Sequence, residues 1–150
     1  MNEPEIKEIY QNYPLSLLLE ADPDIKKIEK YLNKGRCFAV FDGPRTIGVY
    51  VLKDLKNKTA EIMNIAVSEQ YRRQGLGRLL IQDAITRARN DGFETLLIAT
   101  GKDSFQQYFY ESCGFSVYET DEGYFSRAYT QPVVDNGVVL TDLARLSLKL

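Results

Sequence analysis

Residues 69–85 of this 150-residue chain read EQYRRQGLGRLLIQDAI, and this stretch decides how the surrounding sequence folds. An apolar run, EIMNIAV at 61–67, precedes it, and a second apolar run, TLLIA, follows at 95–99. Between them Leu76, Leu80, Ala84 and Ala88 form one i,i+4 row, which predicts a helix over 76–90. The strand–helix–strand order predicts a crossover whose two strands lie parallel.

The turn before this helix contains Gly75 and Gly77, with arginines at 72, 73 and 78. Glycine lets backbone N–H groups approach a ligand closely, and the unpaired N–H groups at a helix N-terminus favour an anion. We therefore expect a phosphate or pyrophosphate on the amides of residues 73–78, with the arginine side chains adding positive charge. The alternative is an ordinary glycine turn with solvated arginines.

Two other phosphate-binding motifs do not fit the sequence. A P-loop needs Gly-x4-Gly-Lys-Ser/Thr, but Leu96 stands at the first glycine position before Gly101-Lys102, and Asp103 follows the lysine. A dinucleotide-binding fingerprint needs a third glycine where Leu80 stands.

Composition restricts the chemistry. Lys+Arg number 19 and Asp+Glu 21, for a net charge of −2, which does not favour nucleic acid or a membrane surface as a partner. The chain has no histidine, so histidine triads and histidine metal sites are excluded, and we expect no metal. Proton transfer must use Glu, Asp, Tyr, Cys or Lys.

The remaining compositional features predict a cytoplasmic protein. Cys37 and Cys113 match no metal or redox spacing, and they are expected to be free thiols in a reducing compartment. No apolar run approaches the roughly 20 residues of a membrane span. Residues 1–10 are charged and lack the apolar core of a signal peptide.

The rest of the chain predicts an α/β domain with a mixed sheet. A helix is expected to start at Asp22-Pro23, with Asp22 as its cap, and to end at Gly35. The other expected elements are a strand or an unordered lead at 6–11, a short helix at 14–21, strands at 37–41 and 46–52, a helix at 104–112, and strands at 115–118, 124–129 and 138–150. The alternating RLSLKL at 145–150 is typical of a sheet edge, which suggests a homodimer through the C-terminal strand.

Two motifs resemble a known family. RRQGLG at 72–77 is similar to the acyl-CoA signature Arg/Gln-x-x-Gly-x-Gly/Ala of the GNAT acetyltransferase superfamily, which follows a strand ending such as Ile65-Ala66-Val67. YESCGF at 110–115 resembles the family's Tyr-x-x-x-Gly-Phe at the end of the next helix. The resemblance covers roughly 37–118. It implies one GNAT domain over 1–150, with a mixed, mostly antiparallel sheet whose central parallel pair splays apart between flanking helices.

The resemblance also implies acetyl-CoA as the co-substrate. Its pyrophosphate would lie on the turn, its pantetheine arm between the splayed strands, and its acetyl carbonyl at the strand backbone. At the position where many members have an asparagine that contacts the CoA arm, this chain has Asp103, which could cap the following helix, and Ser104 could replace the polar contact. The candidate CoA-binding residues are therefore Ile65, Ala66, Val67, Arg72, Arg73, Gln74, Gly75, Leu76, Gly77, Arg78, Asp103 and Ser104.

Two residues are candidates for proton transfer. The resemblance makes Tyr110 the acid beside the CoA sulfur, although its aromatic neighbours also suit core packing. Glu61 resembles the glutamate of the histone-acetyltransferase branch and would be the base, directly or through a water; the alternative is an exposed residue at the strand start. Strand alternation predicts Glu61 on the face of Met63, Ile65 and Val67, with Asn64 opposite.

The expected acceptor is a primary amine, and a simple amine, a polyamine, an aminoglycoside and a peptidyl lysine are all open. Acidic residues near aromatic ones would suit a cationic amine, although they could equally form a solvated acidic face; they are Glu20, Asp22, Asp24, Asp121, Glu122 and Asp135, with Tyr13, Tyr124, Phe125 and Tyr129. Members that act on protein N-termini often carry a glutamate on the strand at 95–101, which is absent here. The alternatives are an acyl-CoA-binding sensory module without turnover, and transfer of another acyl group or to a hydroxyl.

Overall fold

The computed structural model describes residues 4–150, and its centre is one mixed sheet of seven strands. The strand order is β1-β2-β3-β4-β5-β9-β6, and β4–β5 is the parallel pair among antiparallel neighbours. The predicted α/β class and the parallel crossover are confirmed. The strands are β1 Ile6–Ile9, β2 Arg36–Asp42, β3 Arg45–Asp54, β4 Thr59–Val67, β5 Thr95–Gly101, β6 Ser116–Asp121 and β9 Leu143–Lys149.

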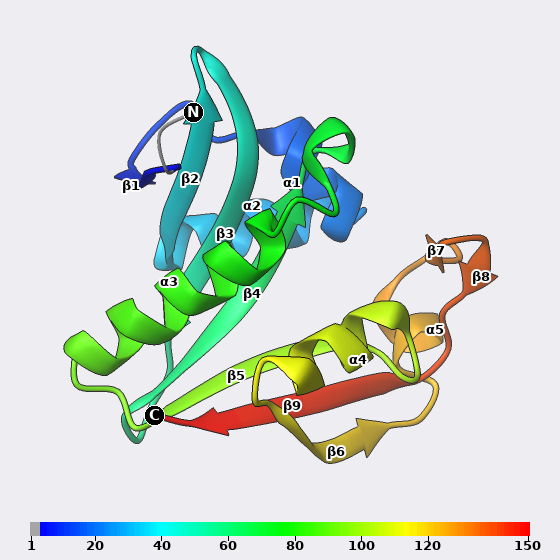
Figure 1. The fold of residues 1–150 in the computed structure, drawn as a ribbon. Helices are drawn as coiled ribbons and strands as arrows, with labels where there is room; N and C mark the ends of the chain where they lie inside the picture. Colours follow the sequence, from blue (N-terminus) through cyan, green and yellow to red (C-terminus); the bar gives the residue numbers. More distant parts are fainter. Residues whose placement is uncertain (1–3) are drawn as a thin grey trace.

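Helices cover both faces of this sheet (Figure 1). α1 Leu15–Ala21 and α2 Ile25–Lys34 bury their apolar residues on one face, and α3 Leu76–Asn90 and α4 Phe105–Ser112 on the other. α3 has the predicted bounds. The smaller elements are the 3-10 turn η1 Glu69–Tyr71, helix α5 Tyr124–Ala128 and the hairpin of β7 Val134–Asp135 with β8 Val138–Val139. No helix in residues 4–150 is both long and apolar enough to cross a membrane.

The parallel pair separates along its length. β4 and β5 are hydrogen-bonded only where Thr59–Ile62 lies beside Thr95–Ile98. Beyond that point β4 stays with β3 and β5 stays with β9, so the two halves of the sheet diverge as a V (Figure 1). The predicted splay is confirmed, and it leaves one side of the second half of β4 without a strand partner in the described sheet.

A bulge in β4 changes which side chains share a face. Leu52 pairs with Ile62 but Val51 pairs with Asn64, so Met63 is the extra residue. Ile62 therefore packs in the core beneath α3, whereas Asn64 is among the residues beneath α1 and α2.

The predicted face of Glu61 is therefore right only for Met63, which also packs on the α1–α2 side, and wrong for the other residues. Glu61 precedes Ile62 and lies on the α1–α2 side of the sheet, together with Asn64, while Ile65 and Val67 pack against the α3 core. The prediction assumed that successive side chains of β4 alternate between the two faces of the sheet without interruption. One extra residue moves every later side chain to the opposite face.

The cap of α2 also differs from the expectation. Asp24 caps this helix, because its Oδ1 accepts hydrogen bonds from the amides of Lys26 and Lys27 at 3.0 and 3.4 Å. Asp22 instead lies at the C-terminal end of α1 and is buried. Gly35 ends α2 as predicted, but in an extended conformation: a Cβ there would lie 2.8 Å from the Tyr31 carbonyl oxygen.

Two predictions for the C-terminal part are wrong. Residues 124–128 form α5 rather than a strand. β9 pairs with β5 on one side and β6 on the other, so it is an interior strand and offers no free edge to a second copy. The alternation at 145–150 reflects one buried and one polar face, with Leu146 in the core and Arg145 opposite, and interior strands can share this pattern.

The two cysteines are free, as expected. Cys37 is buried, and burial raises the pKa of its thiol to about 12. Cys113 is half-buried.

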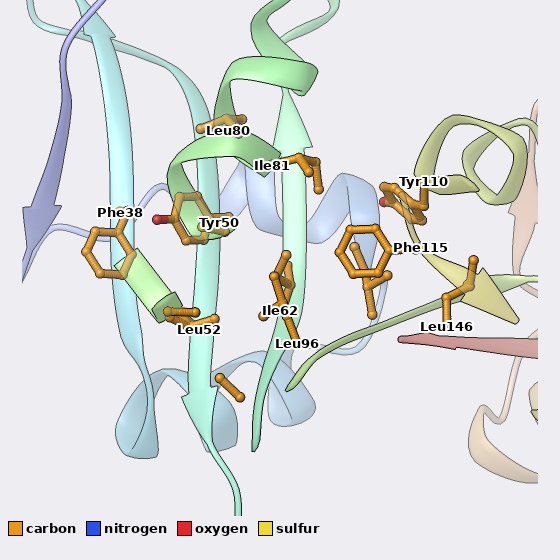
Figure 2. Packing of buried hydrophobic residues seen from close by; sticks show 14 of the residues in the cluster. Phe38, Tyr50, Leu52, Ile62, Leu80, Ile81, Leu96, Tyr110, Phe115 and Leu146 are labelled. Carbon is orange, nitrogen blue, oxygen red and sulfur yellow. The ribbon is translucent and has the colours of Figure 1, made fainter. Parts of the chain in front are cut away.

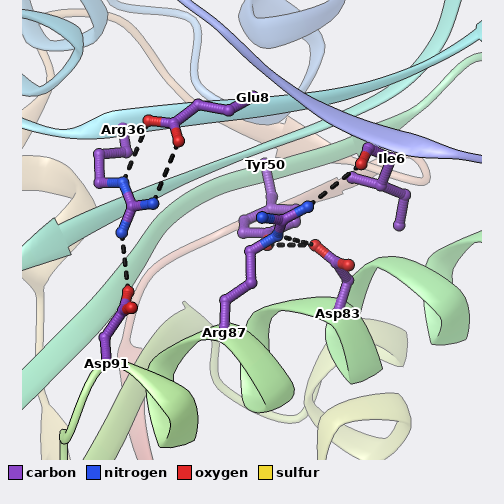
Figure 3. Close-up of polar contacts among 7 residues, drawn as sticks. All are labelled: Ile6, Glu8, Arg36, Tyr50, Asp83, Arg87 and Asp91. Atoms are coloured by element: carbon purple, nitrogen blue, oxygen red, sulfur yellow. Dashed lines mark hydrogen bonds and ion pairs between the residues drawn. The ribbon is translucent and has the colours of Figure 1, made fainter.

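A buried polar cluster fixes α3 on the sheet (Figure 3). The Tyr50 hydroxyl donates a 2.6 Å hydrogen bond to Asp83, which also accepts one of 2.7 Å from Arg87 Nε. Arg87 donates a second hydrogen bond, of 3.1 Å, to the carbonyl of Ile6, and its guanidinium lies over the Phe38 ring. The cluster joins β1, β2 and β3 to the middle of the helix whose N-terminus is the predicted anion site.

Replacing Tyr50 with Phe tests this cluster. Tyr50→Phe removes a buried donor from Asp83 and should lower the free energy of unfolding by about 1–2 kcal/mol, measured by urea denaturation. Tyr108→Phe makes the same chemical change on an exposed ring and is the control. Equal stabilities of the two variants would contradict a structural role for the Tyr50 hydroxyl.

Candidate active site

The turn that leads into α3 presents an open helix N-terminus. Gly75 is the N-cap residue with φ 82°, and no side chain caps the helix. Arg73 also has a positive φ of 62°. Leu79 makes the first helical hydrogen bond, from its N–H to the Gly75 carbonyl at 3.0 Å, so the amides of the first turn precede the hydrogen-bonded part of the helix. This geometry suits an anion.

Several side chains of the turn hold the turn itself. Arg72 Nε donates to the Val67 carbonyl at 3.0 Å and so ties the turn to the end of β4. Arg78 lies over the Phe109 ring and donates to Ser112 Oγ at 3.1 Å, which ties α3 to α4. The turn is therefore braced on both sides, and its backbone is held in place for a ligand.

A cavity of about 720 Å³ opens where β4 and β5 separate. Of the predicted site residues, Glu61, Ile65 and Tyr110 line it. Ala66, Val67, the turn at 72–78, Asp103 and Ser104 lie outside its lining. Its size is in the range of small-molecule sites. The structure thus brings both candidate proton-transfer residues to one cavity, although they come from different elements.

Tyr110 is both a core residue and a cavity residue. Its ring packs between Phe109 and Phe115, with centroids at 5.7 and 6.3 Å, and Figure 2 shows it between α4 and the strands. Burial raises the pKa of its hydroxyl, so the group is protonated at neutral pH. Packing and a role in the site are therefore compatible.

Glu61 is half-buried and has an unusual electrostatic environment. Burial raises the pKa of its carboxyl, and the nearby charges of Arg145 and Lys53 oppose that rise without cancelling it. A carboxylate with a raised pKa is a stronger base than an exposed one.

Asp103 does not cap α4. Ser104 does, because its Oγ accepts the Gln107 amide at 3.2 Å. Asp103 is exposed with φ 60°, and its own amide donates to the Gln107 side chain at 2.6 Å. The sequence did not predict these contacts of Gln107, because no local pattern indicates them.

A second polar network, centred on Asp22, also lines the cavity, and no sequence pattern predicted that its members would meet. The Asp22 carboxylate accepts hydrogen bonds from the hydroxyls of Tyr31 and Tyr129 at 3.2 and 3.0 Å. Asn64 donates to the Tyr31 hydroxyl at 2.8 Å. Asp22, Tyr31, Asn64 and Tyr129 all line the cavity. Helical spacing marks Tyr31 only as a core residue, and Tyr129 is 107 residues away from Asp22.

The model of a known family, described as the Acetyltransferase (GNAT) family, matches residues 4–115. The chain belongs to the GNAT acetyltransferase family. The resemblance seen in the two motifs is confirmed. Among residues 4–150 no group of three His, Cys, Asp or Glu side chains is placed to hold a metal.

Individual GNAT proteins are similar over nearly the whole chain. An uncharacterized N-acetyltransferase of Bacillus subtilis, YvbK, is 39% identical over 135 residues, which are 89% of this chain and 87% of the relative. An IAA acetyltransferase from Bacillus cereus has a TM-score of 0.93 at 38% identity, covering 99% of this chain and 100% of that one. A GNAT acetyltransferase from Elizabethkingia anophelis with acetyl-CoA bound has a TM-score of 0.94 at 34% identity, with both chains fully covered.

The raised pKa of Glu61 predicts how stability depends on pH. Between the usual carboxyl pKa and the raised one, the folded state binds more protons than the unfolded state, so the free energy of unfolding falls as pH rises through this window. Glu61→Gln has no carboxyl group to titrate, so its free energy of unfolding does not fall for this reason. We expect it to be more stable relative to wild type at pH 7 than at about pH 4, measured by urea denaturation at both values. Glu29→Gln, on the exposed face of α2, is the control. A difference that does not change with pH would contradict the assigned environment.

Proposed function

We propose that this GNAT protein transfers the acetyl group of acetyl-CoA to a primary amine by direct attack in a ternary complex. One observation carries the proposal: β4 runs from Glu61 in the cavity to Val67, and the chain then continues through η1 into the open turn of α3. A single strand thus connects a proton-accepting group with an anion site, and Tyr110 faces the same cavity from α4.

The diphosphate of acetyl-CoA would lie on the amides of residues 73–78. The pantetheine arm would follow β4 beyond Ile62, where the departure of β5 leaves the backbone groups on that edge of β4 without a strand partner. Its amide groups can bond to this edge as an added strand would. The acetyl carbonyl would be bound by the backbone of residues 65–67. The Elizabethkingia relative with acetyl-CoA bound, which shares this fold at 34% identity, supports the choice of co-substrate.

The chemistry requires three proton movements: two protons leave the nitrogen and one reaches the CoA sulfur. Glu61 takes a proton from the acceptor's ammonium, directly or through a water, which frees the nitrogen lone pair. The nitrogen attacks the thioester carbonyl, a C–N bond forms and the C–S bond breaks. Tyr110 supplies a hydrogen bond and a proton to the departing CoA thiolate. The nitrogen loses its second proton as the amide forms, and this proton returns to the Tyr110 oxygen through solvent. The raised pKa of Tyr110 keeps its proton on the oxygen until the thiolate develops. The products are an amide and free CoA.

Tyr110→Phe separates an enzyme from an acyl-CoA-binding module without turnover. The ring already packs among phenylalanines, so the variant should fold normally. We expect kcat for amine-dependent thiol release to fall by roughly 10²–10⁴-fold, the usual value of general acid catalysis, with the Kd for acetyl-CoA unchanged. Unchanged turnover would contradict the acid assignment. Binding of acetyl-CoA without thiol release from any amine would favour the binding module.

The turn can be tested with two matched glycine variants. Gly75 and Gly43 both have positive φ, of 82° and 60°, and a Cβ added at either would meet open space, so alanine strains the backbone similarly at both sites. Gly75→Ala should weaken acetyl-CoA binding several-fold in calorimetry, because it disturbs the amides that hold the diphosphate. Gly43→Ala, in the β2–β3 hairpin, should bind like wild type. Equal Kd values for all three proteins would contradict the turn as the diphosphate site.

A further inference from the structure

Asp22 is a buried carboxylate whose partners are all neutral. Its oxygens accept hydrogen bonds from the Asp24 amide at 3.1 Å and from the hydroxyls of Tyr31 and Tyr129. The residue is 9% exposed, and it lines the same cavity as Glu61. Within residues 4–150 no lysine or arginine nitrogen lies within 4.0 Å of it. Buried carboxylates are normally paired with a cation, so this charge lacks its usual partner.

Asn64 supplies a second, independent observation. It is 5% exposed and lines the cavity, and its Nδ2 donates to the Leu18 carbonyl and to the Tyr31 hydroxyl. Its Oδ1 is buried and has no hydrogen-bond partner among residues 4–150. An unfilled buried acceptor is costly, and an N–H donor would satisfy it. The network thus contains a negative charge without a paired cation and an acceptor without a donor, and an ammonium group would complement both.

The aromatic wall beside Asp22 suits the same group. Tyr124, Phe125 and Tyr129 line the cavity, and the last two rings stack with their centroids 6.0 Å apart. The Lys27 ammonium lies 5.1 Å from the centroid of the Tyr129 ring, so this ring already accepts a cation on its face. Lys27, Lys30 and Lys53 also line the cavity, and an acceptor with a carboxylate would pair with them instead.

We propose that Asp22 binds a second, non-reacting ammonium group of the acceptor, so that the preferred acceptor is a diamine or polyamine. This proposal rests on the proposed acetyl transfer. It places two nitrogen atoms of one acceptor molecule in different parts of the cavity. Glu61 deprotonates the amine that is acetylated, while the other amine stays charged and pairs with Asp22 beneath the aromatic rings. Tyr31 and Tyr129 are positioning residues, because their hydroxyls orient the carboxylate.

The test compares acceptors that share a carbon count: putrescine, n-butylamine and γ-aminobutyrate, with cadaverine and spermidine to vary the spacing. Thiol release from acetyl-CoA gives kcat/KM for each. In the wild type we expect a diamine or polyamine to be preferred over n-butylamine by roughly 10- to 100-fold, as for a hydrogen bond to a charged group. Asp22→Asn keeps one of the two acceptor oxygens, and its new amide N–H can donate to the other tyrosine hydroxyl, but it removes the charge and should abolish this preference.

Asp24→Asn is the matched control. It removes the same charge two residues away, outside the cavity lining, and asparagine caps a helix as well as aspartate does. It should retain the wild-type preference. Equal losses in the two variants, a preference for γ-aminobutyrate, or an equal loss for putrescine and n-butylamine in Asp22→Asn would each overturn the proposal.

A binding measurement separates this proposal from acetyl transfer itself. Putrescine is titrated by calorimetry into wild type and into Asp22→Asn, each saturated with CoA, where no reaction can occur. Binding that weakens by roughly tenfold or more in Asp22→Asn supports the subsite even if no thiol is ever released. Binding that does not depend on Asp22 overturns it even if amines are acetylated.

Discussion

The early end of the β4–β5 pairing is the constraint on which the rest of the structure depends. Parallel hydrogen bonds stop at Ile62 and Ile98, and each strand then follows its other neighbour. The separation exposes one backbone edge of β4, opens the cavity, and leaves α3 and α4 to cover the two halves separately (Figure 1). A fully paired sheet would have closed this space with side chains. The cavity therefore exists because β4 and β5 are not paired along their full length. The cluster of Tyr50, Asp83 and Arg87 holds α3 against the sheet beside it.

The bulge at Met63 changes which side chains of β4 lie on each face of the sheet. Before it, Ile62 packs beneath α3; after it, Asn64 lies beneath α1 and α2 while Ile65 rejoins the α3 core. Glu61 consequently shares a face with Asn64 and with the Asp22 network, opposite the helix that presents the open turn. This division suits a two-substrate reaction, since a cofactor and an acceptor can approach one thioester from opposite sides of the opening.

The acceptor side is assembled from the two ends of the chain. Asp22 directly follows α1, Tyr31 lies in α2, and Tyr129 directly follows α5. Tyr129 reaches Asp22 because β9 inserts between β5 and β6 and carries the preceding segment back over the cavity. The family model ends at residue 115, so this part of the wall lies beyond the matched region. The proposed acceptor subsite thus combines residues inside the matched region, Asp22 and Tyr31, with Tyr129 outside it.

The sequence alone determined the α/β class, the bounds of α3, the parallel crossover and the glycine turn, because these follow from local periodicity and backbone freedom. It also pointed to the family and to Glu61, Tyr110 and the turn as candidates. Only the tertiary structure decided the rest: the face of Glu61, which depends on an unpredictable bulge; the interior place of β9, whose alternation fits edge and interior strands alike; α5 in place of a strand; and the partners of Asp22. These features depend on contacts between residues far apart in the chain, and local sequence patterns carry no record of such contacts.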